Sequence, residues 1–593
     1  MLTMDYSLLL PALPALFLSL SLLNYERTLT PMYGTVPTNQ YLQHFVFLAI
    51  ALSIYMRPQF SSTARKYLFS GSILALAPNA IYYFAAWSAR QRNPIWGPVF
   101  VHTFALIPLV YAYGIFLPAR GMLSVWGTLL SSFVLSKRLW PAVPQLRSIS
   151  DNDIYLSQAL ILLAIGVLHL DFSTPTPSKA SKKPTASSNT AYATKVTLLA
   201  VLTTLAFTPL TSWFRSPILR HPYPETYTHP SFPLQIHSAV ESTTGLIVVG
   251  EALTPPKADP LDINSMHSVR YLRAAHSILG GVWMGNRVHT IDGIVPVKDS
   301  FGTRLGDSIY GAFNLQEVAR LVERDRKKGK RKALIIGLGA GISATAFHRH
   351  GLNLTVLEID PAVYKAARQF FGFPDPGEEN VFLEDAGGWI TSRANWLKVG
   401  DGEDDSSLYD FAIHDCFSGG GVPQHLYEIE FLNSLKKLMK PDGVVVVNYA
   451  GVVDSEPARL LLRTLDEAFS QCRAFHDLMH ADALKKEEYH SQFVNVVFLC
   501  TMRPDTPITF RAPDMMDYLG SHLRKHMITT LKDREVDLDI LRKSMERIEQ
   551  EEGRETKVLS KEYNPLGKMQ SEQATKHWTV MREVLPDIYW ETF

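Results

Sequence analysis

The hydrophobic pattern divides the chain into two parts. In the first part, long apolar runs alternate with short polar segments, and several runs approach the roughly 20 residues that cross a hydrocarbon core of about 30 Å. Tyr and Trp recur near their ends, as they do at membrane interfaces. We therefore predict about seven membrane spans, with six or eight as alternatives. The stronger runs begin at Tyr6, Tyr41, Tyr67 and Pro98, and the weaker ones cover residues 122–135, 154–170 and 196–214.

A cleaved signal peptide is the alternative for the first run. Asp5 precedes that run, no basic segment leads into it, and further apolar runs follow, so a span is favoured. Residues 173–194 are rich in Ser, Thr, Pro and Lys, which predicts a flexible loop before the last span. Repeated prolines over 216–233 mark the exit from the membrane, and we place the end of a multi-pass domain at residue 230 (1–230).

The spacing of the apolar residues changes after residue 230. Residues 231–320 contain short β-like runs, at 236–252, 270–284 and 290–297, and a helix at 309–326. Over 321–502, near-continuous apolar strands alternate with helices, a pattern that is typical of a parallel sheet covered on both faces. The predicted fold is an α-helical multi-span membrane domain followed by an α/β Rossmann-like domain with a small N-terminal β element. Residues 503–593 are a charged helical extension.

A glycine cluster follows the first strand of this alternation. Gly337, Gly339 and Gly341 form G-x-G-x-G, whereas the dinucleotide fingerprint would need Gly or Ala where the chain has Ile342. A nicotinamide or flavin site is therefore disfavoured. The glycines still allow a tight turn and the close approach of a ligand.

Acidic residues follow the next two strands. Glu358 and Asp360 close the second strand, where a carboxylate can accept both hydroxyl hydrogens of a ribose. Asp385, followed by Ala386, comes after the third strand, in position to reach an adenine amino group. This constellation predicts an S-adenosylmethionine site of the class I type, since that cofactor has no pyrophosphate and needs no lysine in the loop. The alternative is a doubly wound domain whose glycines only serve a turn. The predicted cofactor-binding residues are Gly337, Gly339, Gly341, Glu358, Asp360, Asp385 and Ala386.

Several segments together resemble the spermidine synthase family, and most closely its membrane-fused relatives. They are "LIIGLGAGISATAF", "LTVLEIDPAV", "LEDAGGWI" and the stretch 409–451, and the resemblance covers residues 236–502. It implies that Glu358 binds the ribose and that Asp385 lies beside the adenine. The family's glycine-loop aspartate is replaced by Ala340.

The residues that handle the amine substrate in this family are the ones that differ here. The first Asp of the family's D-S-S/T-D-P motif matches Asp415, but the second falls at Ser418. The family's Tyr-His-Glu corresponds to Tyr310, Gly311 and Ala312. An alkylammonium with a pKa of about 10.4 benefits from such acids when it must lose a proton. Methyl transfer needs mainly proximity and alignment.

We therefore predict a transferase that moves a methyl group from S-adenosylmethionine to a small or lipophilic acceptor. Asp415 is the candidate carboxylate near the acceptor or the cofactor's amino group, and Tyr310 is a candidate wall or hydrogen-bond donor. Two alternatives stay open. One is an aminopropyltransferase using decarboxylated S-adenosylmethionine, with its missing acids supplied by the hairpin at 242–245 or the loop at 259–267. The other is a nucleoside-binding sensor or transporter.

Other reactive side chains favour structural roles. His414 and His425 are interpreted as hydrogen-bonded structural residues, and Cys416 as packing. The spacing of Cys416, Cys472 and Cys500 fits neither a disulfide framework nor a zinc site, which predicts free thiols in a reducing compartment and no metal. Because the cofactor is made in the cytosol, we expect a cytosolic catalytic domain on a membrane that the sequence does not identify.

The expected partners are a lipid bilayer and a small-molecule acceptor, with a homodimer as a further possibility. Charges of alternating sign over 522–555 argue against nucleic acid. The aromatic ending over 577–593 has two open interpretations, docking on the soluble domain or on the membrane.

Overall fold

A computed structural model describes most of the chain and divides it into two compact units. Unit 1 comprises Met1–Tyr223 and Leu585–Phe593, and unit 2 comprises Pro224–Val584. The described residues are 6–56, 59–60, 62–117, 127, 130–171, 186–206, 209–223, 225–254, 268–285, 288–324, 331–397, 407–416, 421–503 and 506–593.

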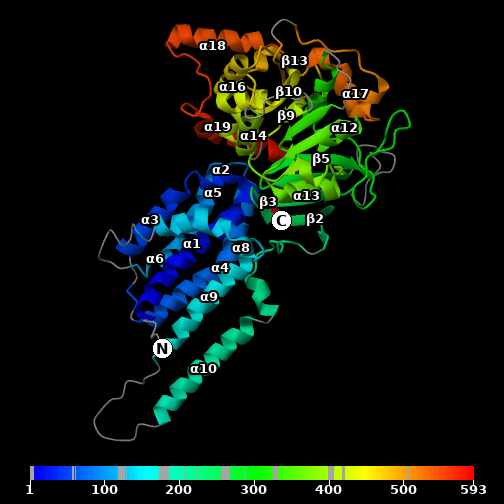
Figure 1. The fold of residues 1–593 in the computed structure, drawn as a ribbon. Coiled ribbons are helices and arrows are strands. Elements are labelled where there is room, and N and C mark those ends of the chain that lie inside the picture. The colour runs from blue at the N-terminus through cyan, green and yellow to red at the C-terminus, as the bar shows by residue number, and fades with distance from the viewer. Residues whose placement is uncertain are drawn as a thin grey trace. The chain divides into compact units, whose positions relative to one another are not determined.

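Unit 1 is helical (Figure 1). A π-helical turn at His102–Leu106 joins α5 to α6. Its α-helices are α1 (Tyr6–Tyr33), α2 (Thr35–Asn39), α3 (Leu42–Tyr55), α4 (Thr63–Ala89), α5 (Trp96–Val101), α6 (Ile107–Gly114), α8 (Pro144–Arg147), α9 (Asp151–Leu168), α10 (Ala186–Ala206) and α20 (Asp587–Glu591).

Three stretches of unit 1 are long and apolar enough to cross a membrane, among the residues that the structure describes. They are Thr63–Ala89, Trp96–Gly114 and Asp151–Leu168, and Thr190–Leu205 is a shorter apolar helix. The count of about seven spans stays a prediction, and half of the run at 122–135 lies outside the described residues. The loop predicted over 173–194 is helical from Ala186 onward, while residues 173–185 lie outside the described residues.

The last residues of the chain return to unit 1. Arg90 donates two hydrogen bonds to the carboxylate of Glu591, of 2.7 and 2.5 Å, and the Tyr82 hydroxyl donates to the Glu591 carbonyl at 2.9 Å. The Leu219 N–H donates to the carbonyl of Phe593. Residues 585–593 of the aromatic ending therefore dock on the helical unit, whereas Trp578 stacks on His276 within unit 2, with ring centroids 5.7 Å apart.

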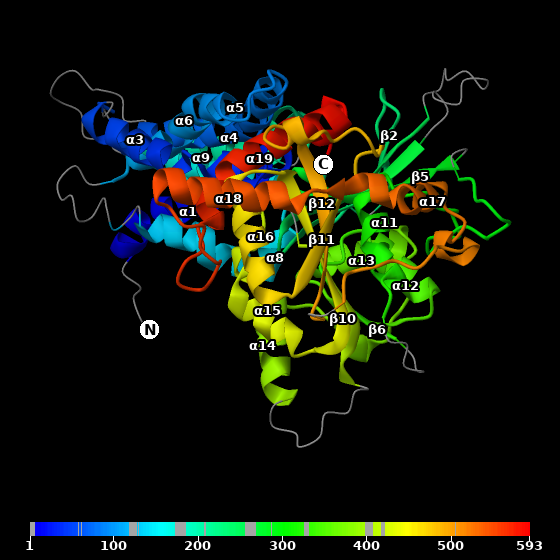
Figure 2. The same cartoon turned by 90° about the horizontal axis from the view of Figure 1, so that it is seen from above.

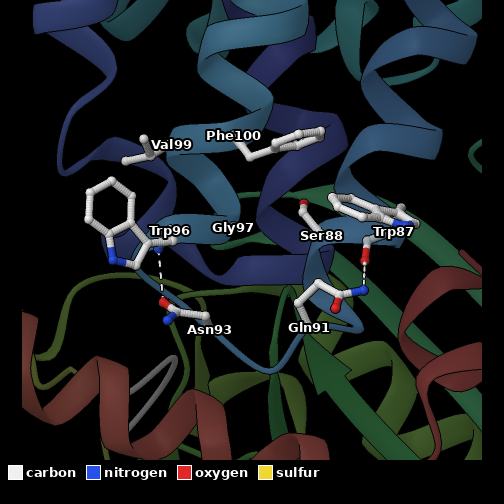
Figure 3. A pocket seen from close by; sticks show the side chains of 8 residues that line it. All are labelled: Trp87, Ser88, Gln91, Asn93, Trp96, Gly97, Val99 and Phe100. Carbon is white, nitrogen blue, oxygen red and sulfur yellow. Dashed lines mark hydrogen bonds between the residues drawn. The ribbon is translucent and has the colours of Figure 1, made fainter.

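Unit 1 also holds a cavity of about 360 Å³ between the end of α4 and the start of α5 (Figure 3). Trp87, Trp96 and Phe100 line it with five smaller residues, and Asn93 accepts a hydrogen bond from the Trp96 N–H at 2.9 Å. All the residues predicted to bind cofactor or acceptor lie in unit 2, and none of them lines this cavity.

Unit 2 contains two sheets. The smaller one is antiparallel throughout, in the order β1-β2-β3-β4-β5. Its strands are β1 (Tyr227–Thr228), β2 (Leu234–Ser242), β3 (Gly245–Ala252), β4 (Ser268–Ala274) and β5 (Ser277–Met284). The larger sheet comprises β6 (Lys332–Ile336), β7 (Asn353–Leu357), β8 (Val381–Phe382), β9 (Tyr409–His414), β10 (Met439–Val452), β11 (Gln471–His476), β12 (Phe493–Thr501) and β13 (Glu535–Val536).

The strand order of the larger sheet is β13-β11-β12-β10-β9-β6-β7-β8. β10, β9, β6, β7 and β8 run parallel, and β12, β11 and β13 are antiparallel additions at one edge. The chain moves outward from β6 through β7 to β8, and then returns to build β9 on the other side of β6. Sheets of this topology bind their ligands at such a reversal, outside the carboxyl ends of the strands, which here are β6 and β9.

Helices cover both faces of this sheet, which explains its continuous apolar strands (Figure 2). One face packs on α14 (Ala386–Leu397), α15 (Ile429–Lys436) and α16 (Glu456–Ala468) through side chains such as Ile390, Phe431 and Leu461. The other packs on α11 (Ala312–Gln316), α12 (Ile342–Arg349) and α17 (His522–Thr529). α13 (Pro361–Phe370) packs against the small sheet. α18 (Leu538–Glu552) and α19 (Leu566–Val584) complete the unit.

The predicted Rossmann-like α/β architecture is confirmed, with two local corrections. Residues 290–297 form no strand, because Asp292 and Gly293, with φ of 62° and 67°, turn the chain there. The helix predicted over 309–326 is only α11 followed by a 3-10 turn at Glu317–Leu321.

The expectation of free cysteines is wrong for two of the three. Cys472 of β11 and Cys500 of β12 face each other in the antiparallel register and form a disulfide, with Cα atoms 4.1 Å apart. Sequence spacing could not indicate this bond, because it depends on which strands pair. The thiols therefore give no support to a reducing compartment.

Candidate active site

The glycine loop after β6 has a backbone conformation that disfavours residues with a Cβ atom. Gly337, Gly339 and Gly341 have φ of +82°, +54° and +72°. A Cβ at Gly337 would lie 2.2 Å from the Asp415 carbonyl oxygen, and one at Gly339 would lie 2.8 Å from that of Leu279. The loop thus passes between the end of β9 and the small sheet at very close range, which only glycine allows.

Glu358 follows β7 and holds this loop. Its side chain is buried, Oε2 accepts the Leu338 N–H and Oε1 accepts the Asp360 N–H, both at 2.9 Å. Burial raises the pKa of Glu358, although these backbone donors oppose the shift. Each carboxylate oxygen keeps a further lone pair. Glu358 can therefore organise the glycine loop and still accept the hydroxyl hydrogens of a ribose.

Asp360, predicted from the sequence to bind the cofactor, has partners within the protein, and its cofactor role stays a prediction. Its carboxylate is fully buried and caps α13 by accepting the Ala362 and Val363 N–H groups. It also accepts the Ser242 hydroxyl at 2.5 Å and the hydroxyl and N–H of Thr244 at 2.7 and 2.9 Å. These five bonds use the carboxylate to join the β2–β3 turn to α13, which favours a structural role.

Asp385 lies after β8 and is 44% exposed. Oδ2 accepts the Gly388 N–H at 3.0 Å, and Oδ1 is 2.7 Å from His425 Nε2. Partial burial acts to raise the pKa of Asp385, but Gly388 and His425 outweigh it and hold that pKa below its ordinary value. The next residue, Ala386, is buried and begins α14. His425, interpreted from the sequence as structural, thus belongs with the predicted adenine-side acid.

Asp415 stands at the carboxyl end of β9, beside the glycine loop. Gln316 donates from Nε2 to Oδ2 at 2.7 Å, and Asn448 donates from Nδ2 to Oδ1 at 2.9 Å. Burial raises the pKa of Asp415, and the two amides oppose the shift. Sequence reasoning missed both amides. Asn448 left one signal, since it is a polar residue inside the apolar strand β10, but nothing in the sequence pointed to Gln316.

Tyr310 precedes α11 and is partly buried, with its ring centroid 6.1 Å from that of Phe313. Burial, with a contribution from the Asp477 carboxylate, raises the pKa of Tyr310, so the phenol is a hydrogen-bond donor at neutral pH. Burial also raises the pKa of Asp477 to about 6, against hydrogen bonds from Asn495. The sequence did not identify Asp477 as a neighbour of Tyr310.

His414 and Cys416 do not look like reactive groups. Burial lowers the pKa of His414 to about 4, and its ring lies edge-on to Tyr427 at 4.6 Å. Burial raises the pKa of Cys416, so its thiol stays protonated and is a poor nucleophile. Both residues have packing roles, as the sequence predicted for Cys416.

The residues present fit an S-adenosylmethionine site. The glycine loop is a cradle that any Cβ would obstruct, Glu358 retains acceptor capacity at its rim, and Asp385 is exposed at the next strand end. Among the described residues, no group of three His, Cys, Asp or Glu side chains could hold a metal ion. The roles of Asp415 and Tyr310 in the reaction stay predictions.

Comparison with known proteins agrees with this geometry. Residues 316–476 match the spermine/spermidine synthase domain. Over 585 residues the chain is 29% identical to the N-terminal histidine N-methyltransferase of Emericella nidulans, covering 95% of this chain and 93% of that relative. It is 37% identical over 119 residues to the polyamine aminopropyltransferase of Vibrio vulnificus, covering 20% of this chain and 37% of that relative. It is 25% identical over 194 residues to the human eEF1A lysine and N-terminal methyltransferase, covering 31% of this chain and 24% of that relative.

The fold and the site define a class I S-adenosylmethionine-dependent transferase. Within that class, residues 316–476 are similar to the spermine/spermidine synthase domain. Relatives named as methyltransferases favour methyl transfer over aminopropyl transfer.

Proposed function

We propose that this protein is a membrane-bound methyltransferase that transfers a methyl group from S-adenosylmethionine to a histidine at the N-terminus of a polypeptide. The observation that carries the proposal is the similarity to the Emericella nidulans enzyme, which extends through both units rather than through the transferase domain alone. This acceptor differs from the small or lipophilic molecule expected from the sequence.

The chemistry of an N-terminal histidine supports the proposal. Its imidazole has an ordinary pKa of about 6.5 and its α-amino group one of about 7.7–8.0, against about 10.4 for an alkylammonium. Either nitrogen has a substantial neutral fraction near pH 7, so it needs less help from a carboxylate to become a nucleophile. The loss of the family's amine-side acids is therefore compatible with this acceptor.

The environment of Ala340 also disfavours aminopropyl transfer. Its side chain is buried in an apolar cluster with Leu272 and Phe371, and a Cβ added to Gly280 of β5 would come within 2.8 Å of it. An aspartate at this position, as in the family's glycine loop, would bring an unpaired carboxylate into that cluster. The replacement therefore suits the packing of the small sheet against the loop.

In this proposal, each part of the site has a separate task. The cofactor, when bound, supplies an electrophilic methyl group on a sulfonium. Glu358 and the glycine loop hold the nucleoside, Asp385 with His425 lies at the adenine side, and Asp415 accepts N–H hydrogens near the reacting centre. Tyr310 donates a hydrogen bond or forms a wall.

A methylation assay tests this function directly. The full chain in detergent is incubated with S-adenosylmethionine and a synthetic peptide that begins with histidine, and fragment masses locate any added methyl group. We expect one methyl group or more on the first residue, none on a control peptide with alanine placed before the histidine, and none with Glu358→Ala. Transfer from decarboxylated S-adenosylmethionine to a polyamine, without peptide methylation, would contradict the proposal.

The proposed location is an integral membrane one, supported by the three long apolar helices. Cofactor supply favoured a cytosolic catalytic unit, but the Cys472–Cys500 disulfide favours an oxidising compartment. An N-terminal histidine also arises only after proteolysis, because synthesis begins with methionine. We place unit 2 on the oxidising side, which requires delivery of the cofactor across the membrane.

In sealed vesicles with the cytosolic face outward, we expect unit 2 to resist added protease, and maleimide to label Cys472 and Cys500 only after lysis and reduction. Cleavage and direct labelling would instead support the cytosolic location.

A further inference from the structure

Three side chains from separate elements, the buried Gln316 and Asn448 and the partly buried Asp415, form one polar group at the strand ends. Asp415 follows β9, Asn448 lies in β10 and Gln316 ends α11, and each amide donates its N–H to a different oxygen of the carboxylate. The parallel register pairs Val447 with His414, which sets Asn448 beside Asp415. We call these three residues the amide–carboxylate trio.

The trio leaves two buried acceptors unused. Gln316 is 0% exposed and Asn448 is 6% exposed, and neither Gln316 Oε1 nor Asn448 Oδ1 has a hydrogen-bond partner among the described residues. The amide orientations are fixed, because turning either one over would set its carbonyl oxygen against the carboxylate of Asp415. Buried acceptors without partners cost free energy and call for an explanation.

The free positions of the trio are all acceptors. They are two amide oxygens and the remaining lone pairs of a carboxylate, so the group repels anions and suits a nitrogen that carries several N–H donors. The trio also adjoins the predicted cofactor site, since a Cβ at Gly337 would meet the Asp415 carbonyl oxygen at 2.2 Å. Two nitrogen groups come to this place in the proposed reaction: the ammonium of the cofactor's methionine part, and the amino or imidazole group of the acceptor.

We propose that the amide–carboxylate trio is the receptor for an N–H-bearing nitrogen group, with Gln316 and Asn448 as binding residues beside Asp415. This deepens the proposed function and rests on it for the identity of the acceptor. Gln316 Oε1 and Asn448 Oδ1 accept hydrogen bonds from the bound nitrogen, and Asp415 supplies the charge that attracts it.

The test uses ligands that differ in the nitrogen group. S-adenosylhomocysteine carries the methionine-derived ammonium, whereas methylthioadenosine has the same nucleoside without the amino-acid part. Calorimetry on the full chain in detergent measures the affinity for each of the two nucleosides in the wild type, Gln316→Met and Asn448→Leu. A second titration measures the affinity of the same proteins for the histidine peptide when they are saturated with S-adenosylhomocysteine. Gln573→Met is the matched control, because its amide donates to Tyr449 in the same unit but outside the trio.

If the trio binds the cofactor's ammonium, both trio variants bind S-adenosylhomocysteine about tenfold or more weakly than the wild type does. Their affinity for methylthioadenosine stays within about threefold of the wild type. If the trio binds the acceptor, the affinities for both nucleosides are unchanged, and the affinity for the peptide falls about tenfold or more. Either result supports the proposal when Gln573→Met shows neither change.

Equal weakening of both nucleosides would indicate a structural role and overturn the proposal, and so would no change for any ligand. Failure of the proposed function is a separate result, in which the wild type does not methylate the peptide. The comparison of S-adenosylhomocysteine with methylthioadenosine then decides the proposal alone. Thermal unfolding of each variant identifies one that has failed to fold, and the other trio variant then carries the test.

Discussion

Gly337→Ala is expected to reduce the affinity for S-adenosylmethionine by about tenfold or more, because an added carbon in a tightly packed place costs about 1–3 kcal/mol. The added Cβ would lie 2.2 Å from the backbone oxygen of Asp415, so either the glycine loop or the end of β9 must move. Both carry predicted site residues. Calorimetric titration of the full chain in detergent measures the loss.

A matched control separates this collision from backbone strain. Gly351 has φ of +78°, close to the +82° of Gly337, but a Cβ there would meet nothing within 4 Å. Gly351→Ala therefore introduces the left-handed strain of about 1–2 kcal/mol without a clash. We expect its affinity for S-adenosylmethionine to stay within about threefold of the wild type. Similar losses for both variants would show that strain, and not the narrow passage of the loop, controls binding.

The parts of the site that the sequence could predict are those set by chain order alone. In a parallel sheet the carboxyl ends of the strands meet at one edge, so the glycines after β6, Glu358 after β7 and Asp385 after β8 had to lie near one another. The positions of the helices between them followed from apolar periodicity. No knowledge of which strands pair was needed for these residues.

The parts that could not be predicted depend on contacts between distant segments. Asp360 is a helix cap that also holds the β2–β3 turn, more than a hundred residues away in the sequence. Gln316 reaches Asp415 from a short helix that precedes the sheet, and Cys472 meets Cys500 only because β11 pairs with β12. Sequence position suggested a cofactor role for Asp360 because the residue stands two places after Glu358, at the same strand end.

Asp360→Ala is expected to destabilise the contact between α13 and the small sheet by about 2.5–8 kcal/mol. Loss of the helix cap costs about 0.5–2 kcal/mol, and the donors of Ser242 and Thr244 that lose their acceptor cost about 1–3 kcal/mol each. Because the chain has two units, a single unfolding transition is not assured. Native-state hydrogen exchange of peptides that cover residues 242–252 and 361–370 measures the local effect.

The same variant decides between the structural and the cofactor role of Asp360. Asp537→Ala is the matched control. Asp537 caps α18 by accepting the Asp539 N–H at 3.2 Å, is 35% exposed and pairs with the exposed Lys486, so a loss of about 1 kcal/mol is expected there. If Asp360 is structural, faster exchange accompanies an S-adenosylmethionine affinity within about threefold of the wild type at temperatures where the site is folded. A loss of affinity for S-adenosylmethionine with unchanged hydrogen exchange would show that Asp360 binds the cofactor. The two carboxylates of this strand end would then share the ribose, and the five hydrogen bonds of Asp360 would have to open when the cofactor binds.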